Sequence, residues 1–338
     1  MPTPTLRRAR DRFEAAAGSR VPIVVWAVVV LAGLGALVAA MVPTGPSWLS
    51  GAGAVAIASA YSWALAARTG GRPMVCGGLA LALGLAVLVL DLDVLRTGAA
   101  VLTCVVSAVL GVVATVPAVT YLRAAREAVI AVLIAAVGAL ATVGFEPVIT
   151  LARFEYATLG LALLGAFGVV YRLGAGFHGL GRRGVLVVLI GTAVLALALL
   201  YAELLRNYGT PGLIRTLLDG VVWTREHLGA FPRPIESILG VPALVWGCHL
   251  RARRRQGWWV CAFGVGATAS VAQALLNPQV SLLESALSAV YGLVVGLAIG
   301  FVVIRLDLAL TGPRGGRARR AEEAAAVRPE PARTQPLL

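Results

Sequence analysis

Polar side chains that could bind a ligand are few in this sequence, and three of them lie at the ends of two neighbouring apolar runs. Gln273 and Asn277 close one run, and Glu284 lies about one helical turn into the next. An unpaired carboxyl group is costly to bury, so it usually lines a cavity or finds a polar partner. We therefore predict that Glu284, Gln273 and Asn277 converge on a polar cavity. Ordinary hydrogen bonding between the two helices is the alternative.

Motifs typical of catalytic or cofactor sites find little support. None of the three histidines, His178, His227 and His249, has a metal-ligating partner three or four residues further on, and the four cysteines form no CxxC pair. The segment 174–179 matches GxGxxG, but it lies between two apolar runs and not between a strand and a helix. The sequence thus predicts no catalytic residue, no metal centre and no cofactor.

The apolar runs predict an all-α, polytopic transmembrane helix bundle. Hydrophobic residues make up 59% of the 338 residues, charged residues only 13%, and the mean hydropathy is +0.87. A helix of about 20 apolar residues crosses the roughly 30 Å hydrocarbon layer of a bilayer. About ten runs meet this criterion: 22–42, 49–67, 74–92, 98–121, 128–146, 154–172, 185–204, 235–250, 257–276 and 283–306.

Arginine positions predict the orientation of these spans. The chain has no Lys, and 23 of its 29 Arg residues fall in alternate loops and in the two terminal segments. Cytoplasmic loops carry the excess of positive charge, so both termini are expected in the cytoplasm. The six exceptions are Arg96, Arg153, Arg206, Arg215, Arg225 and Arg233. Abundant Arg, Ala, Val and Gly without Lys suggests a GC-rich bacterial genome, and hence the bacterial plasma membrane.

One long loop on the outer side, about 205–234, predicts an amphipathic helix at about 210–229. Thr210 and Pro211 form a favourable helix start, and Gly229 a favourable end. Its apolar side chains recur at helical spacing, which predicts a helix lying in the outer interface. We consider two roles for this helix, a structural lid or a gate for a lipid-like substrate. The candidate gate residues are Leu213, Leu217, Asp219 and Trp223.

The last apolar run carries a motif for close helix packing. Gly292, Gly296 and Gly300 are spaced four residues apart, so they form one bare strip on a helix. In lipid such a strip lets the backbone of a second helix approach closely. The sequence favours a partner helix in the same chain over one in a second copy.

The two ends of the chain are expected to lie outside the membrane. Residues 1–21 form a cytoplasmic, Arg-rich segment, and the first apolar run is too long for a typical cleaved signal. Residues 22–306 form the transmembrane domain. Residues 307–338 combine Pro, Gly, Arg and Glu with little apolar content, which predicts a disordered cytoplasmic tail.

Two functions fit this organisation. The first hypothesis is a transporter or flippase-like protein for a small or lipid-like substrate, because ten spans with both ends inside is a common transporter layout. The alternative is a non-catalytic subunit that scaffolds cell-envelope assembly or secretion machinery. The expected partners are the bilayer and its anionic headgroups, which account for the net charge of +13 without any nucleic acid. A second copy of the chain or another membrane subunit remains open as a further partner.

The orientation can be tested with reporter fusions along the chain. Fusions after Arg126, Arg183 and Arg255 should report the cytoplasm, because positively charged loops stay there. Fusions near Tyr208 and Pro278 should report the outside. A cytoplasmic signal from position 208 would overturn the ten-span arrangement from its seventh span onward.

Overall fold

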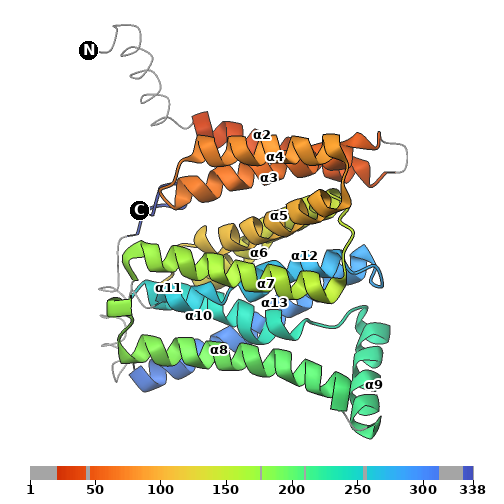
Figure 1. Cartoon of the computed structure of the whole chain (residues 1–338). Coiled ribbons are helices and arrows are strands. Elements are labelled where there is room, and N and C mark those ends of the chain that lie inside the picture. The colour runs from red at the N-terminus through yellow and green to blue at the C-terminus, as the bar shows by residue number, and fades with distance from the viewer. Residues whose placement is uncertain are drawn as a thin grey trace, which may run out of the picture.

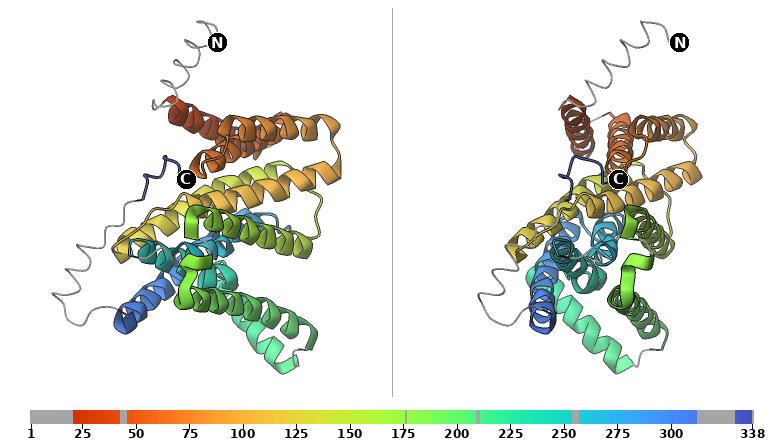
Figure 2. Two further views of the ribbon diagram at one scale, coloured as in Figure 1. Left: turned by 60° about the vertical axis from the view of Figure 1, so that its left-hand side comes forward. Right: turned by 90° about the vertical axis from the view of Figure 1, so that its left-hand side faces the viewer.

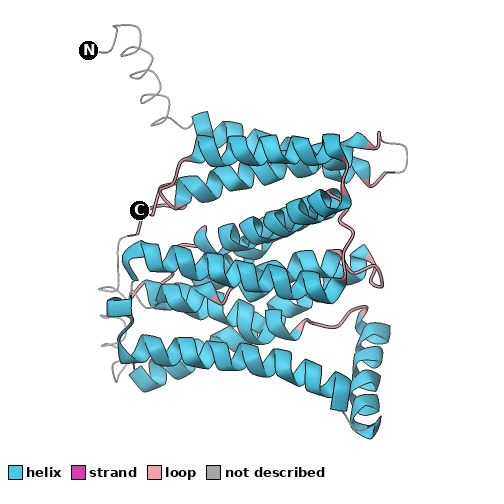
Figure 3. Cartoon of the chain, in the orientation of Figure 1, coloured by secondary structure: helices cyan, strands magenta, loops and turns pink. Residues whose placement is uncertain are grey.

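The computed structural model describes residues 21–42, 46–175, 177–208, 211–253, 257–311 and 330–337, and within them it contains helices and no strand (Figure 3). The α-helices are α2 (Val21–Ala40), α3 (Trp48–Arg68), α4 (Pro73–Leu90), α5 (Asp93–Val113), α6 (Tyr121–Gly144), α7 (Leu151–Val170), α8 (Phe177–Tyr208), α9 (Pro211–Leu228), α10 (Val241–Arg251), α11 (Gly257–Ala262), α12 (Val265–Leu275) and α13 (Leu282–Thr311). Two π-helical turns, η1 (Tyr171–Ala175) and η2 (Ile235–Gly240), adjoin α7 and α10. The prediction of an all-α fold is confirmed for this part of the chain.

Within the described residues, eight helical stretches are long and apolar enough to cross a membrane, which is consistent with a multi-pass membrane protein. They correspond to α2 to α7, to 257–275 (α11 with α12) and to α13. Two of the ten expected spans do not meet the criterion. The apolar stretch 184–200 within α8 is shorter, and the segment 235–251 is divided between η2 and α10.

The long helices run between two common ends of the bundle (Figure 1). Val21 and residues 330–337 lie at one end, which we call the tail end. Helix α9 lies across the opposite end, which we call the α9 end. Successive helices change direction, so α3, α5 and α10 all finish at the tail end.

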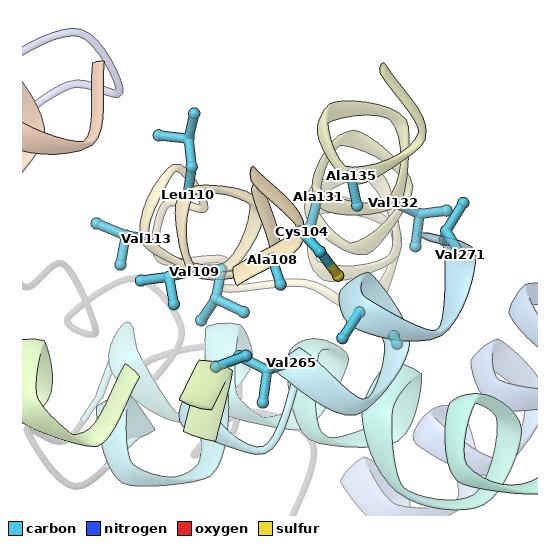
Figure 4. Packing of buried hydrophobic residues seen from close by; sticks show 14 of the residues in the cluster. Cys104, Ala108, Val109, Leu110, Val113, Ala131, Val132, Ala135, Val265 and Val271 are labelled. Atoms are coloured by element: carbon cyan, nitrogen blue, oxygen red, sulfur yellow. The ribbon is translucent and has the colours of Figure 1, made fainter. Parts of the chain in front are cut away.

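A helical hairpin made of η2, α10, α11 and α12 lies inside the bundle, and we call it the central hairpin. Of the stretch 257–275, 94% is buried. Helix α12 packs against α5, α6, α7, α13 and η2, whereas α2 and α4 lie at one side of the bundle (Figure 2). Small side chains fill much of this contact, including Cys104 and Ala108 of α5, Ala131 of α6 and Val265 of α12 (Figure 4). Lipid provides no hydrophobic driving force for helices to associate, so close packing must hold them together. Small residues permit this close approach of the helix axes.

Glycines hold the two arms of the central hairpin against each other. A Cβ placed on Gly247 would lie 2.5 Å from the Sγ of Cys261, and one on Gly257 would lie 2.5 Å from the backbone nitrogen of Arg251. Gly264, between α11 and α12, similarly has no room for a Cβ beside Leu244. The hairpin is therefore fixed by backbone contact and not only by interdigitated side chains.

The glycine strip of α13 lies on η2 and α10 of the same chain. A Cβ on Gly296 would lie 2.5 Å from the Cβ of Val241, and one on Gly300 would lie 3.0 Å from the Cβ of Val245. A Cβ on Gly292 would lie 2.7 Å from the carboxyl carbon of Glu236. The strip thus brings the backbone of α13 directly onto the central hairpin.

We predict that Gly296→Leu lowers the free energy of unfolding by about 1–3 kcal/mol, because extra carbons in a packed contact force the helices apart. The measurement is denaturant unfolding in detergent micelles. Gly160→Leu is the matched control, since a Cβ on Gly160 of α7 meets no atom within 4 Å. Equal stability of the two variants would contradict the close packing of α13 on α10.

Candidate functional site: polar clusters at the two ends of the central hairpin

The three residues predicted to form a cavity have no partner in common. Glu284 forms an ion pair with Arg225 of α9, with 3.0 Å between Oε1 and Nε. The amide nitrogen of Gln273 donates to the carbonyl oxygen of Glu155 and to Oγ1 of Thr158, both at 3.1 Å. Asn277 accepts a hydrogen bond from the backbone N–H of Gln279. These contacts join α9 to α13 and α7 to α12, and their convergence on one cavity stays a prediction.

Helix α9 occupies Pro211–Leu228, close to its predicted bounds. Gly229 ends it with a left-handed φ of +79°, and its N–H donates to the carbonyl of Arg225, as expected for a glycine after a helix. Of the candidate gate residues, Asp219 is exposed and Trp223 is 57% exposed, with its ring stacked on His227. The side chains of Leu213 and Leu217 lie outside the described residues. A gate role for α9 remains a prediction.

A carboxyl group that the sequence did not single out is buried near the α9 end. Glu236, the second residue of η2, has no exposed surface. Its Oε2 accepts a long hydrogen bond from Ser270 at 3.4 Å, while Oε1 has no hydrogen-bond partner among the described residues. The carboxylate lies over the backbone of Gly292, where an added Cβ would lie 2.7 Å from the carboxyl carbon and would force the side chain of Glu236 to shift. Its position at the start of the expected span 235–250 was the signal that could have identified it.

Arg233 is the cation nearest to this carboxyl group in sequence. It precedes η2, donates to the carbonyl of Ser270 at 3.4 Å, and lies 3.8 Å from the carboxylate of Glu155. Burial lowers the pKa of Arg233 by more than the charges of Glu155 and Glu236 raise it. Arg233 therefore faces the charges of two carboxyl groups, of which only Glu236 is fully buried.

A second cluster of charges surrounds the last turn of α10 at the tail end. The side chain of Arg251 is fully buried. Its guanidinium group donates to Oγ1 of Thr115 at 2.7 Å and to the carbonyl of Thr115 at 3.1 Å, and it lies 3.5 Å from the centre of the Trp258 ring. It also pairs with the carboxylate of Glu330 at 2.6 Å. A buried guanidinium group is stable only when its donors are met in this way.

Glu127 of α6 is the buried anion of this tail-end cluster. It has no exposed surface, and its Oε2 accepts from the backbone N–H of Val116 at 3.0 Å. Arg126 pairs with Oε1 at 3.0 Å, and Arg333 pairs with Oε2 at 2.6 Å. Glu127 therefore links α6, the turn after α5 and residues near the C-terminus.

Arg68, at the end of α3, completes the tail-end cluster. It is 4% exposed and donates to the carbonyls of Val113, Ala332 and Gln335, at 3.2, 2.6 and 2.5 Å. Its own carbonyl accepts from the N–H of Leu337, whose side chain packs on the hydrophobic core. Three helices and the C-terminal residues therefore meet at these charges.

Two parts of the expected tail, 307–338, belong to the described residues. Helix α13 continues to Thr311, and residues 330–337 lie against α3, α6 and α10 through the contacts above. The physical reason is that Glu330 and Arg333 meet buried opposite charges, which composition alone does not reveal. Residues 312–329 lie outside the described residues. We call 330–337 the tail segment.

Comparisons with known proteins give no family for this chain: no family model, no curated protein and no solved structure matches it. Within the described residues, no group of three or more His, Cys, Asp or Glu side chains could hold a metal ion. The two polar clusters are therefore the features that can indicate a function. Both lie on the central hairpin, with Glu236 at one end of its first arm and Arg251 at the other.

Proposed function

We propose that this protein is a transporter or flippase-like protein that moves a small or lipid-like substrate across a bacterial plasma membrane. The observation that carries the proposal is the buried carboxyl group of Glu236, which has an oxygen without a hydrogen-bond partner among the described residues. An ionisable group is expensive inside an apolar bundle and is typically retained where it binds a substrate or moves a proton. A purely structural hairpin could replace Glu236 by an apolar residue.

The form of the central hairpin supports the same proposal. Its first arm begins with a π-helical turn, and its second arm is interrupted at Phe263 and Gly264. Interrupted helices and π-turns are frequent at the binding sites of transporters, because they free backbone groups to contact a ligand. In this proposal α8 and the segment 235–251 complete ten spans, both termini are cytoplasmic, and α9 lies in the outer interface.

The orientation gives the two clusters different environments. The tail-end cluster would lie at the cytoplasmic headgroups, and Glu236 would lie in the outer half of the membrane. The scaffold hypothesis predicts instead that Glu236 only fixes η2 against α12 and α13. The two hypotheses differ in whether removal of the charge changes movement across the membrane without changing the fold.

The test is a flipping assay with purified protein in liposomes that contain a fluorescently labelled phosphatidylglycerol, with loss of fluorescence to an external reductant as the readout. Wild-type protein should speed lipid movement above protein-free liposomes. Glu236→Gln should slow that movement at least tenfold, which corresponds to about 1.4 kcal/mol in the barrier.

Glu226→Gln is the matched control, because this substitution makes the same chemical change at an exposed position of α9. It should move lipid at the wild-type rate. Wild-type liposomes no faster than protein-free ones would contradict the flippase form of the proposal and favour the scaffold. Equal rates for wild-type protein and Glu236→Gln would remove Glu236 from the mechanism.

A further inference from the structure

Two buried guanidinium groups at the tail end contact the tail segment, and only one of them is paired with a carboxylate. Arg251 is paired with Glu330, while Arg68 donates hydrogen bonds to the backbone carbonyl oxygens of Val113 and of the tail segment. Their partners Glu330 and Ala332 are two residues apart in the tail segment, so the two guanidinium groups lie near each other. Buried like charges repel, so this position favours an anion that could serve both groups at once.

The tail segment leaves some donors of these groups unused. Within the described residues, Nη2 of Arg68 and Nε of Arg251 are buried without a hydrogen-bond partner. A buried N–H without a partner has lost its hydrogen bonds to water and gained none in the protein, which is unfavourable. The tail segment is therefore an incomplete partner for the pair.

The chemistry of the pair fits a phosphate group. Arginine binds phosphate oxygens through two parallel N–H donors, and a tetrahedral phosphate presents more acceptor oxygens than the single carboxylate of Glu330. The hydroxyl of Thr115 holds the guanidinium group of Arg251 in place, and Trp258 forms one wall beside it. The site lies at an end of the bundle, at the level where lipid headgroups meet the spans in the proposed membrane arrangement.

We propose that Arg68 and Arg251 form a binding site for a phosphate-bearing anion, and that the tail segment occupies this site until the anion displaces it. In this proposal the carboxylate of Glu330 occupies the place of the phosphate beside Arg251. The carbonyls of Ala332 and Gln335 occupy its place beside Arg68. The anion is either an anionic lipid headgroup or free phosphate, which share this chemistry. The site does not depend on the transport proposal, because it would bind its anion in a scaffold as well.

The test is isothermal titration calorimetry of the full-length protein in zwitterionic micelles. The titrants are a short-chain phosphatidylglycerol, inorganic phosphate and, as a control, a short-chain phosphatidylcholine. Glu330→Gln should bind at least tenfold more tightly than wild type, about 1.4 kcal/mol, because the competing carboxylate is gone. Thr334→Ala, an exposed position on the same segment, should bind as wild type does.

The three titrants separate the sources of the anion. Binding of both phosphatidylglycerol and phosphate supports a general phosphate site, and binding of phosphatidylglycerol alone supports a lipid headgroup. Adding Arg68→Gln to Glu330→Gln should abolish the gain. Equal affinity of wild type and Glu330→Gln, or equal binding of phosphatidylcholine, would overturn the proposal, and neither result requires a variant with an altered core.

Discussion

The need to pair buried charges inside an apolar bundle determines how this molecule is put together. Arg68, Arg251 and Glu127 come from three helices and are each nearly or fully buried at the tail end. An isolated charge in such surroundings would cost several kcal/mol, so each group must find an opposite charge or a set of hydrogen bonds. The pairs Arg251–Glu330 and Glu127–Arg333 meet that need by returning the C-terminus to the bundle.

The central hairpin connects this cluster to the opposite end of the molecule. Its arms touch through glycines, and α13 lies on it through Gly292, Gly296 and Gly300. Backbone contacts of this kind cannot slide by small side-chain adjustments, because interiors are densely packed. Arg251 and Glu236 are therefore held at opposite ends of one rigid arm.

The helices and the packing strip were accessible from the sequence because they follow from local periodicity. The bounds of α9 and the apolar character of α13 need only residues a few positions apart. The partners of the polar groups were not accessible. Arg225 pairs with Glu284 from a distant helix, and Arg68 contacts Ala332 across 264 positions. The ion pairs of Glu330 and Arg333 with buried charges of the bundle were likewise not accessible, because composition does not show which distant charge a side chain meets.

Ion pairs hold the tail segment on the bundle, and the energy of the pair between Glu127 and Arg333 tests this claim most directly. A double-mutant cycle with Glu127→Gln and Arg333→Met measures it as the coupling free energy of unfolding in mixed micelles. We expect a coupling of about 1.5–3 kcal/mol for this pair, because the carboxylate of Glu127 is fully buried although the side chain of Arg333 is 29% exposed. The partly exposed pair Arg225–Glu284, taken through Arg225→Met and Glu284→Gln, should give about 0.2–1 kcal/mol. A coupling for Glu127 and Arg333 no larger than that of this control would contradict the docked tail segment and the proposals built on it.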